Sequence, residues 1–556
     1  MLKFHLLKLV EAFGMVKPIV ERTLEKLIYE CRRCKVWDIL HHPIPNLSGK
    51  RIEFIYALRY VFSFSEPLFL QLLFIFYSLG RFIIMDKVLD IVKTINSYTA
   101  DYILIVLLIG VGLFYTFKTK FVQVRCFGEG MKKVFGNLSL HGGAQKSGMS
   151  SFQALATAIA AQVGTGNIVG ASGAILVGGP GAIFWMWVIA FFGMATIYAE
   201  ATLAQKTRVV DADGNVQGGP VYYIKAAFKG TFGKFLAGFF AIAIVLALGF
   251  MGCMVQSNSI GGAFENAIGI DSWIIGLIVA ALAGLIFIGG VKRIASVTEK
   301  LVPVMAVIFL IGGLVIICIN IKSIPTTFGM IFKYAFNPTA VVAGGLGAAL
   351  KAAISQGAKR GLFSNEAGMG STPHAHALAN VETAHDQGVV AMIGVFIDTF
   401  VVLTMTALVV ISTLYTNGGP LANVIWNDSM AIDKNNAMQT AVSSVFGQDF
   451  GAVFVAICLA FFAFSTIISW NLFGKINFQY LFGKKALIVY TVVAIGFIFL
   501  GSVLKSDLVW ELTDLFNYLM VIPNVIALFA LSKLVKAESN NAYLAKKARK
   551  AMKKAK

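Results

Sequence analysis

Long apolar segments recur along most of the chain and are separated by short polar connections. About 20 mostly apolar residues are enough to cross a bilayer as a helix. Eleven segments meet this criterion, and we predict a membrane-spanning helix in each: 101–117, 151–177, 180–204, 235–257, 272–290, 301–320, 340–358, 388–412, 451–470, 486–504 and 508–532. A weaker segment at 68–85 carries Arg81 near its end, and it is either a twelfth crossing or an interfacial or buried helix.

The composition agrees with this pattern. Of the 556 residues, 57% are hydrophobic and only 13% are charged, about half the charged fraction of an ordinary soluble domain. We therefore predict an all-α polytopic membrane protein of the plasma (inner) membrane. No ATP-binding motif is expected, because "GGAQKSG" at 142–148 lacks the spacing of a phosphate-binding loop. An enzyme would need a nucleophile–base pair or a metal cluster, and the sequence does not assemble either one.

The basic residues favour one orientation, because cytoplasmic connections are enriched in Lys and Arg. If 68–85 crosses the membrane, one side of it holds 39 of the 47 Lys and Arg, in 1–65, 118–150, 205–234, 291–300, 359–387, 471–485 and from 533 onward. We predict that this side, with both termini, is cytoplasmic. The net charge of +19 is then explained by the basic residues of the cytoplasmic side, and it does not indicate nucleic-acid binding. The Lys-rich tail would contact membrane lipids.

The last ten segments divide into two sets of five, 151–320 and 321–532, which begin on opposite sides of the membrane. The first segment of each set is rich in glycine: "GTGNIVGASG" in 151–177 and "AGGLGAALKAAISQG" in 340–358. Glycine weakens a helix by about 1 kcal/mol relative to alanine. Oppositely oriented repeats that open with glycine-interrupted segments indicate a secondary transporter whose unwound backbone forms the binding site. Close helix packing is the alternative explanation for these glycines.

Several longer motifs resemble the alanine/glycine:cation symporter family: "GTGNIVG" (164–170), "GGPGAIFWMWVIAFFGMATIYAE" (178–200), "GGPVYYI" (218–224), "MVQSNSI" (254–260), "GLFSNEAGMGSTPHAHA" (361–377) and "FSTIISWNLFG" (464–474). The resemblance covers residues from about 100 to the end. It implies a leucine-transporter-type inverted repeat of 5+5 helices, one preceding helix, and sodium-coupled uptake of small neutral amino acids, chiefly alanine and glycine.

The domain organisation follows from the repeats and the resemblance. The leading residues 1–95 have no recognised counterpart in the family, and 68–85 lies within them. We predict this N-terminal extension, a preceding helix and loop at 96–150, the first repeat at 151–320, the second at 321–532 and a cytoplasmic tail at 533–556.

An alanine-sized zwitterion needs donors for its carboxylate, acceptors for its ammonium group and a small apolar wall. The unwound "GTGN" can offer backbone N–H groups to a carboxylate, and an asparagine offers both a donor and an acceptor. Trp470 lies one turn after Thr466, so the two share a helix face. We predict a substrate site formed by Thr165, Gly166, Asn167, Gln256, Thr466 and Trp470. Interhelical hydrogen bonds for the amides and an interfacial position for the tryptophan are the alternatives.

Sodium is the expected coupling ion, and no organic cofactor is expected. The fold implied by the resemblance places a sodium site between the first and eighth core helices. Hydroxyls of Ser465 and Thr466 could bind the ion there with carbonyls of Val163 or Gly164 and of Asn167 or nearby. Serine and threonine in membrane helices also bond back to their own helix, which is the alternative.

Ionisable residues inside spans are functional candidates. Asp398 lies midway along "GVFIDTFVVLTM". It either belongs to an ion pathway or gate, or it makes a buried structural hydrogen bond. Glu366 and Glu200 are expected near the cytoplasmic face, paired with Arg360 or with helix termini. Either Asp398 or Glu366 would have to carry a coupled proton, which is the main alternative to sodium. A sensor that evolved from a transporter is the other alternative.

Overall fold

In the computed structural model the chain divides into two compact units, Met1–Asp90 and Ile91–Lys556. The structure describes residues 87–136, 148–211, 216–336, 346–416, 418–422 and 430–555. The predicted segment at 68–85 lies outside these residues. All labelled helices and strands lie in the second unit.

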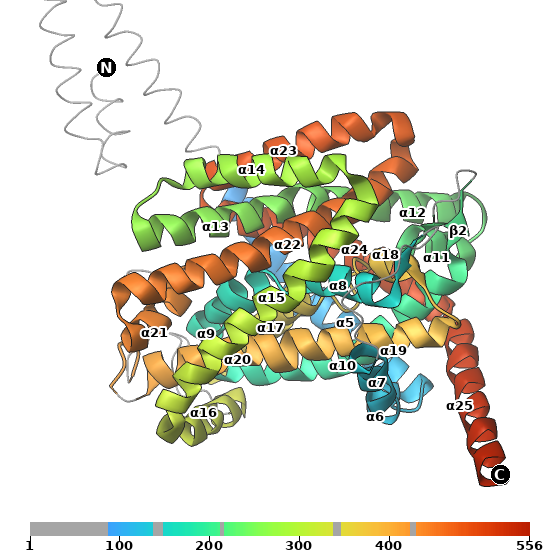
Figure 1. The fold of residues 1–556 in the computed structure, drawn as a ribbon, viewed down its shortest axis with the longest axis horizontal. Coiled ribbons are helices and arrows are strands. Elements are labelled where there is room, and N and C mark those ends of the chain that lie inside the picture. Colours follow the sequence, from blue (N-terminus) through green and yellow to red (C-terminus); the bar gives the residue numbers. More distant parts are fainter. Residues whose placement is uncertain are drawn as a thin grey trace, which may run out of the picture. The chain divides into compact units, whose positions relative to one another are not determined.

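Helices dominate the described residues (Figure 1). In the first half of the unit these are α5 (Ile105–Lys118), α6 (Val122–Arg125), α7 (Phe127–Phe135), α8 (Ser151–Gln162), α9 (Ala171–Gly178), α10 (Gly181–Thr207), α11 (Pro220–Ala227), α12 (Gly230–Ile244), α13 (Cys253–Ile268), α14 (Ser272–Ile288), α15 (Gly290–Ile319) and α16 (Ile324–Phe336). In the second half they are α17 (Leu346–Asn365), α18 (Pro373–Ala377), α19 (Ala384–Val395), α20 (Thr404–Val410), α21 (Ala437–Phe446), α22 (Gln448–Phe482), α23 (Leu487–Val503), α24 (Ser506–Ala530) and α25 (Ser532–Ala555).

Short π-helical and 3₁₀ turns adjoin several of these helices. The π-helical turns are Thr99–Leu104, Gly166–Gly170, Val245–Gly252, Phe396–Leu403 and Ile411–Tyr415, and the 3₁₀ turns are Ile321–Ser323 and Lys484–Ala486. Turns of the π type often occur at functional sites, and two of these, Gly166–Gly170 and Phe396–Leu403, carry candidate site residues.

Strands are minor features of the described residues. β1 (Met149–Ser150) pairs in parallel with β4 (Ala379–Asn380), and β2 (Val209–Val210) pairs antiparallel with β3 (Val216–Gln217). The first pair joins the start of α8 to the segment that precedes α19. It therefore links the opening helix of the first predicted repeat to the second.

Most of the predicted crossings are confirmed. Eight described helices are long and apolar enough to span a membrane, and a bent pair, Ser151–Gln162 with Gly166–Gly178, makes up to nine. The predicted segment 272–290 corresponds to a shorter apolar helix, Ser272–Ile288. The protein is thus an all-α, multi-pass membrane protein.

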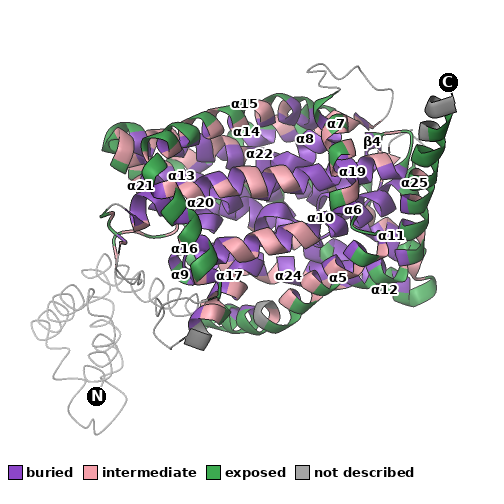
Figure 2. Cartoon of the chain, turned by 90° about the horizontal axis from the view of Figure 1, so that it is seen from below, coloured by how far each residue is buried: buried purple, intermediate pink, exposed green. Residues whose placement is uncertain are grey.

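The inner helices are mostly buried and the outer helices carry exposed residues, as expected for a helical protein surrounded by lipid (Figure 2). Helices such as α10 and α22 lie inside, with long runs of buried residues. On the outer helices large aliphatic side chains are exposed, for example Ile288 at 80% and Ile488 at 76%. Because lipid cannot hydrogen-bond to polar groups, apolar side chains suit this outer surface.

In its described part, from residue 346 on, the second glycine-rich segment is not interrupted where we predicted. α17 runs without a break from Leu346 to Asn365, and the chain leaves the helix only at Glu366. The break therefore lies at 366–372, in "EAGMGST", and α18 follows it. Lys359 and Arg360, which we assigned to a cytoplasmic connection, lie within this helix.

Candidate functional site

The first break, residues 163–170, lies between α8 and α9 and includes the π-helical turn Gly166–Gly170. A capping box between Ser150 and Gln153 starts α8, and the two apolar pieces meet at 45°. At the break, side chains satisfy the backbone N–H groups that no longer bond within a helix. Gly164 N donates to Asn167 Oδ1 at 3.0 Å, and Thr165 N donates to Gln256 Oε1 at 3.1 Å.

Asp398 joins the two broken segments. Its carboxylate accepts hydrogen bonds from Asn167 Nδ2 at 2.7 Å and from Ser364 Oγ at 2.9 Å. Thr399 Oγ1 donates to its second oxygen at 2.8 Å. Asn167 lies in the first break and Ser364 in the last turn of α17, so one buried carboxylate connects both. Both ends of the Asn167 amide, a residue that we predicted for the substrate site, are thereby hydrogen-bonded to protein groups.

The second break is built around Glu366, whose φ of 58° is left-handed, a conformation that is uncommon outside glycine. Its carboxylate accepts hydrogen bonds from Trp470 Nε1 at 2.5 Å and from the Ser371 hydroxyl. The predicted pairing of Glu366 with Arg360 was wrong, because Arg360 pairs with Asp514 instead. Glu366 is fully buried and links this break to α22.

Glu200 of α10 holds the same break from its other side. Its carboxylate accepts hydrogen bonds from Gly368 N at 3.0 Å and from Asn524 Nδ2 at 2.6 Å. Asn524 Nδ2 also donates to Gly368 O at 2.8 Å. The described partners of Glu200 are therefore Asn524 and the N–H of Gly368, which lies in the break three residues after the end of α17.

Ser465 and Thr466 face α8, as the predicted ion site requires. Thr466 Oγ1 donates to Ala160 O at 2.8 Å and to Phe462 O at 3.1 Å, and Ser465 Oγ donates to Phe462 O at 2.8 Å. Among the described hydrogen bonds, none joins these hydroxyls to the carbonyls of Val163 or Gly164. The oxygens that gather here belong to Ala160 and to α22's own backbone, about one turn before the predicted carbonyls.

Trp470 lies inside α22, twelve residues before its last residue, Phe482, so the prediction that it ends the helix was wrong. Its side chain is 1% exposed, which is not the position of an interfacial belt residue. The ring packs edge-on against Phe363 at 5.7 Å between centroids. Trp470 and Phe363 thus form apolar surface between the two breaks.

Three polar atoms beside the first break lack partners among the described residues: Gln162 Oε1, Thr165 Oγ1 and Gln256 Nε2, all buried. A buried polar group that remains unpaired costs about 1–3 kcal/mol. Gly166, the remaining predicted substrate residue, packs against Phe363 and Ser364, since a Cβ there would come within 3.1 Å of Ser364 Cα. The first break therefore combines unpaired polar atoms with close backbone packing.

An ion pair that the sequence analysis missed lies beside these breaks. Arg360 Nη2 of α17 is 3.1 Å from Asp514 Oδ2 of α24, and the guanidinium lies 4.9 Å from the Trp510 ring centroid. Both charged side chains are largely buried, at 15% and 4% exposed. The charge of Asp514 inside an apolar segment was the signal that could have revealed it.

Replacing Asp514 with alanine is expected to lower the free energy of unfolding by about 3–5 kcal/mol, because it leaves Arg360 buried and unpaired. Denaturant unfolding of the purified protein in detergent measures this change. Lys206→Ala is the matched control, since its pair with Glu538 is 41% exposed on the lysine side and should change stability by less than about 1 kcal/mol. Equal effects of the two variants would contradict the stabilising role of the buried pair.

A sequence model of the sodium:alanine symporter family matches residues 85–556. A sodium/alanine symporter from Methanococcus maripaludis is 41% identical over 458 residues, which cover 82% of this chain and 97% of that protein. A probable sodium/glutamine symporter from Bacillus subtilis is 40% identical, with 81% and 90% covered.

A third relative, also from Bacillus subtilis, has a name that proposes sodium/proton-dependent alanine transport; it is 39% identical, with 80% and 90% covered. The family match spans most of the chain and both breaks. The chain therefore belongs to the sodium:alanine symporter family, whose members are transporters and not enzymes.

Proposed function

We propose that this protein imports small neutral amino acids, chiefly alanine and glycine, together with sodium, across the plasma (inner) membrane. The single observation that carries the proposal is the first break. There the buried Thr165 Oγ1 and Gln256 Nε2 have no described partner, so both can bind a polar ligand. Family membership supports sodium-coupled amino-acid transport as the class of activity.

The proposed substrate site lies between the two breaks. The N–H groups at the start of Gly166–Gly170 favour the substrate carboxylate, because a helix N-terminus carries partial positive charge. Gln256 Nε2 and Thr165 Oγ1 supply further donors. Trp470 and Phe363 would limit the size of the side chain, which favours alanine or glycine over the glutamine named for one relative.

The proposed sodium site lies between α8 and α22. Sodium is a hard cation that prefers oxygen ligands, as other hard cations do. The hydroxyls of Ser465 and Thr466 each lie within hydrogen-bond distance of the carbonyls of Ala160 and Phe462. We infer that an entering ion would replace these hydroxyl hydrogen bonds with four oxygen ligands.

Alternating access would rock the two proposed five-helix repeats around these sites. Proton coupling is the second candidate, because Asp398 and Glu366 are carboxyl groups buried beside the breaks. Sodium coupling and proton coupling would both place the coupling ion among the same set of helices. The coupling ion therefore has to be tested directly.

The test is uptake of labelled alanine into proteoliposomes under an inward sodium gradient, an inward proton gradient, or neither. We expect uptake with sodium alone. Thr466→Ala should raise the sodium concentration for half-maximal uptake about tenfold or more, because losing an oxygen that faces a charge costs about 1.5–3 kcal/mol.

Thr440→Ala is the control for this variant, because the Thr440 hydroxyl bonds only to the local Asn436 carbonyl at 3.1 Å among its described contacts. Its sodium dependence should match that of the wild type. Uptake driven only by protons would exclude the sodium site. Alanine binding without uptake under any gradient would instead support the sensor.

A further inference from the structure

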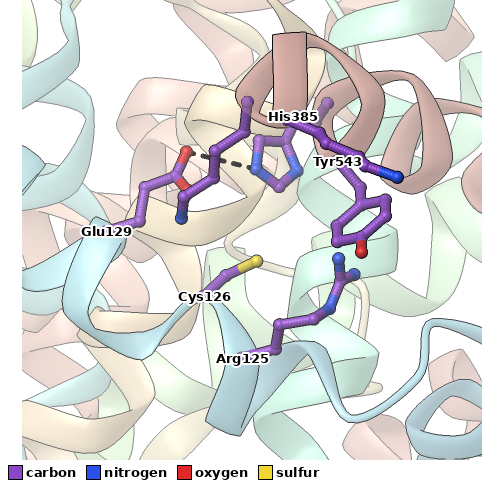
Figure 3. A pocket seen from close by; sticks show the side chains of 8 residues that line it. Arg125, Cys126, Glu129, His385 and Tyr543 are labelled. Carbon is purple, nitrogen blue, oxygen red and sulfur yellow. Dashed lines mark hydrogen bonds and ion pairs between the residues drawn. The ribbon is translucent and has the colours of Figure 1, made fainter. Parts of the chain in front are cut away.

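A separate cluster of metal-binding side chains lies away from the breaks, where α7 meets the start of α19 and the C-terminal helix α25. Cys126, Glu129 and His385 come together beside a cavity of about 290 Å³. Figure 3 shows the Cys126 sulfur and the Glu129 carboxylate directed toward the imidazole. By the predicted orientation this cluster lies at the cytoplasmic end.

The donor atoms are close enough for one ion to bind all three. Each residue offers one ligand atom, and these atoms lie within 4.8 Å of one another. His385 Nε2 is 3.4 Å from Glu129 Oε1. Zinc binds thiolate, imidazole and carboxylate at about 2.0–2.3 Å, and sites with three protein ligands complete the shell with water. The adjoining cavity has room for that water.

The surroundings orient the imidazole for this task. Tyr198 OH lies 2.7 Å from His385 Nδ1, which leaves Nε2 directed at the cluster. A hydrogen bond on the second nitrogen is the usual partner of a metal-binding histidine, because it fixes the tautomer and the ring orientation. Ordinary His–Glu pairing explains the 3.4 Å contact but requires neither the thiol nor this second bond.

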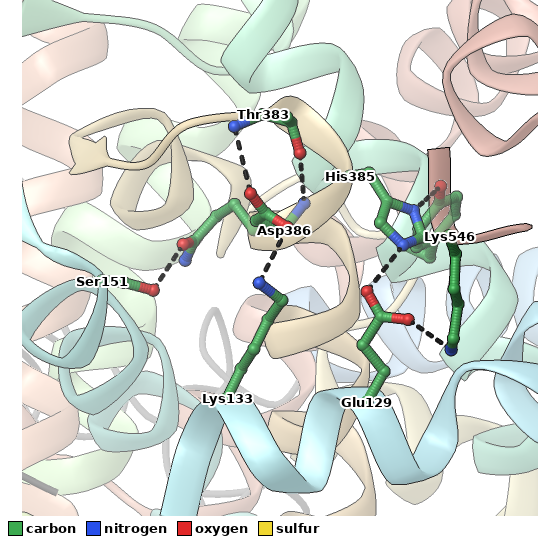
Figure 4. A network of polar contacts seen from close by, with 9 residues as sticks. Glu129, Lys133, Ser151, Thr383, His385, Asp386 and Lys546 are labelled. Carbon is green, nitrogen blue, oxygen red and sulfur yellow. Dashed lines mark hydrogen bonds and ion pairs between the residues drawn. The ribbon is translucent and has the colours of Figure 1, made fainter. Parts of the chain in front are cut away.

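Two basic side chains near the cluster, Lys546 and Arg125, have partners of their own, and Figure 4 shows Glu129 bonded to both His385 and Lys546. Lys546 pairs with Glu129 Oε2 at 2.8 Å, so Oε1 stays directed at His385. Arg125 donates to Thr119 O and to Ser539 Oγ.

We propose that Cys126, Glu129 and His385 form a binding site for a thiophilic divalent cation of the zinc class. On binding, the Cys126 thiol releases its proton to solvent, and the neutral imidazole binds through Nε2. The thiolate and the carboxylate then balance the two positive charges of the ion. The bound metal would link α7 to α19, the helix that continues into the π-helical turn of Asp398.

Cobalt(II) is the probe, because a thiolate–cobalt bond gives a charge-transfer absorption that reports sulfur ligation without any transport assay. The sequence also contains a C-x-x-C pair, Cys31 and Cys34, which could compete for the metal. The full-length protein in detergent should therefore carry Cys31→Ser and Cys34→Ser. We expect one cobalt per chain, an absorption band from Cys126, and displacement of cobalt by zinc. Cys126→Ser should abolish the band.

Cys318→Ser is the matched control, since Cys318 is a free, exposed cysteine elsewhere, and it should keep the band. Tyr198→Phe should keep the fold and lower the affinity for metal about 10- to 100-fold. A band that survives Cys126→Ser, or no band in the starting protein, would overturn the site and leave a His–Glu ion pair. Since metal binding is read without uptake, its failure is distinct from failure of the proposed transport.

Discussion

Asp398→Asn is expected to reduce sodium-driven alanine uptake about 5- to 150-fold. An amide presents one NH₂ donor where the carboxylate has an acceptor, so it opposes a donor from Asn167, Ser364 or Thr399. A buried donor left without an acceptor costs about 1–3 kcal/mol, which corresponds to about that factor. The initial rate of uptake into proteoliposomes measures the effect.

Asp386→Asn is the control, because it makes the same exchange at the start of the same span. Asp386 caps α19 with Thr383 and pairs with Lys133 at 2.9 Å, outside the two breaks. Its uptake should stay within about twofold of wild type, since surface ion pairs contribute about 0–1 kcal/mol. Wild-type uptake by Asp398→Asn would contradict the bridging role. If wild-type uptake instead responds to a proton gradient and uptake by Asp398→Asn does not, the coupled proton binds at Asp398.

The first break could be predicted from the sequence because polar residues lie among its glycines. Thr165 and Asn167 occur at mid-span, where an unbroken helix in lipid has no need of them. In the structure Asn167 bonds to the backbone of Gly164 and to Asp398. The polar residues of the segment therefore indicated the break. The sequence predicted Asn167 for the substrate site, and its bonds to Gly164 and Asp398 emerge only from the structure.

The second break was misplaced because glycine has two uses in membrane helices. Gly357 of α17 allows close packing, since a Cβ there would lie 2.5 Å from Trp185 Cβ and 2.9 Å from Ala182 O. The packing explanation therefore applies to α17, whereas an unwound backbone applies to α8. The signal for the true break was the polar run at Ser364–Glu366, which stands before two glycines of positive φ, Gly368 and Gly370.

Partners distant in sequence could not be predicted at all. Arg360 and Asp514 are 154 positions apart, and Asn167 and Asp398 are 231 apart. Residue type indicated that each charge inside the membrane needs a partner. Which partner it finds depends on how the helices cross, and periodicity along one helix carries no information about that.

Gly164→Ala tests the geometry of the first break most sharply. An added Cβ would lie 2.4 Å from Thr466 Oγ1 and 3.1 Å from Gln256 Oε1. Thr466 cannot easily move, because it is β-branched and its hydroxyl bonds to Ala160 and Phe462. Overpacking of this kind costs about 1–3 kcal/mol, so we expect uptake to fall about tenfold or more and sodium to bind more weakly.

Gly110→Ala is the control, because a Cβ at this position of α5 meets nothing within 4 Å; it should transport as the wild type does. The double variant Gly164→Ala/Thr466→Ala removes the clashing hydroxyl together with the proposed sodium ligand. It should regain the thermal stability lost in Gly164→Ala while its sodium dependence stays weakened. If the double variant regained both, Thr466 would only pack against the break, and the proposed ion would have to bind elsewhere.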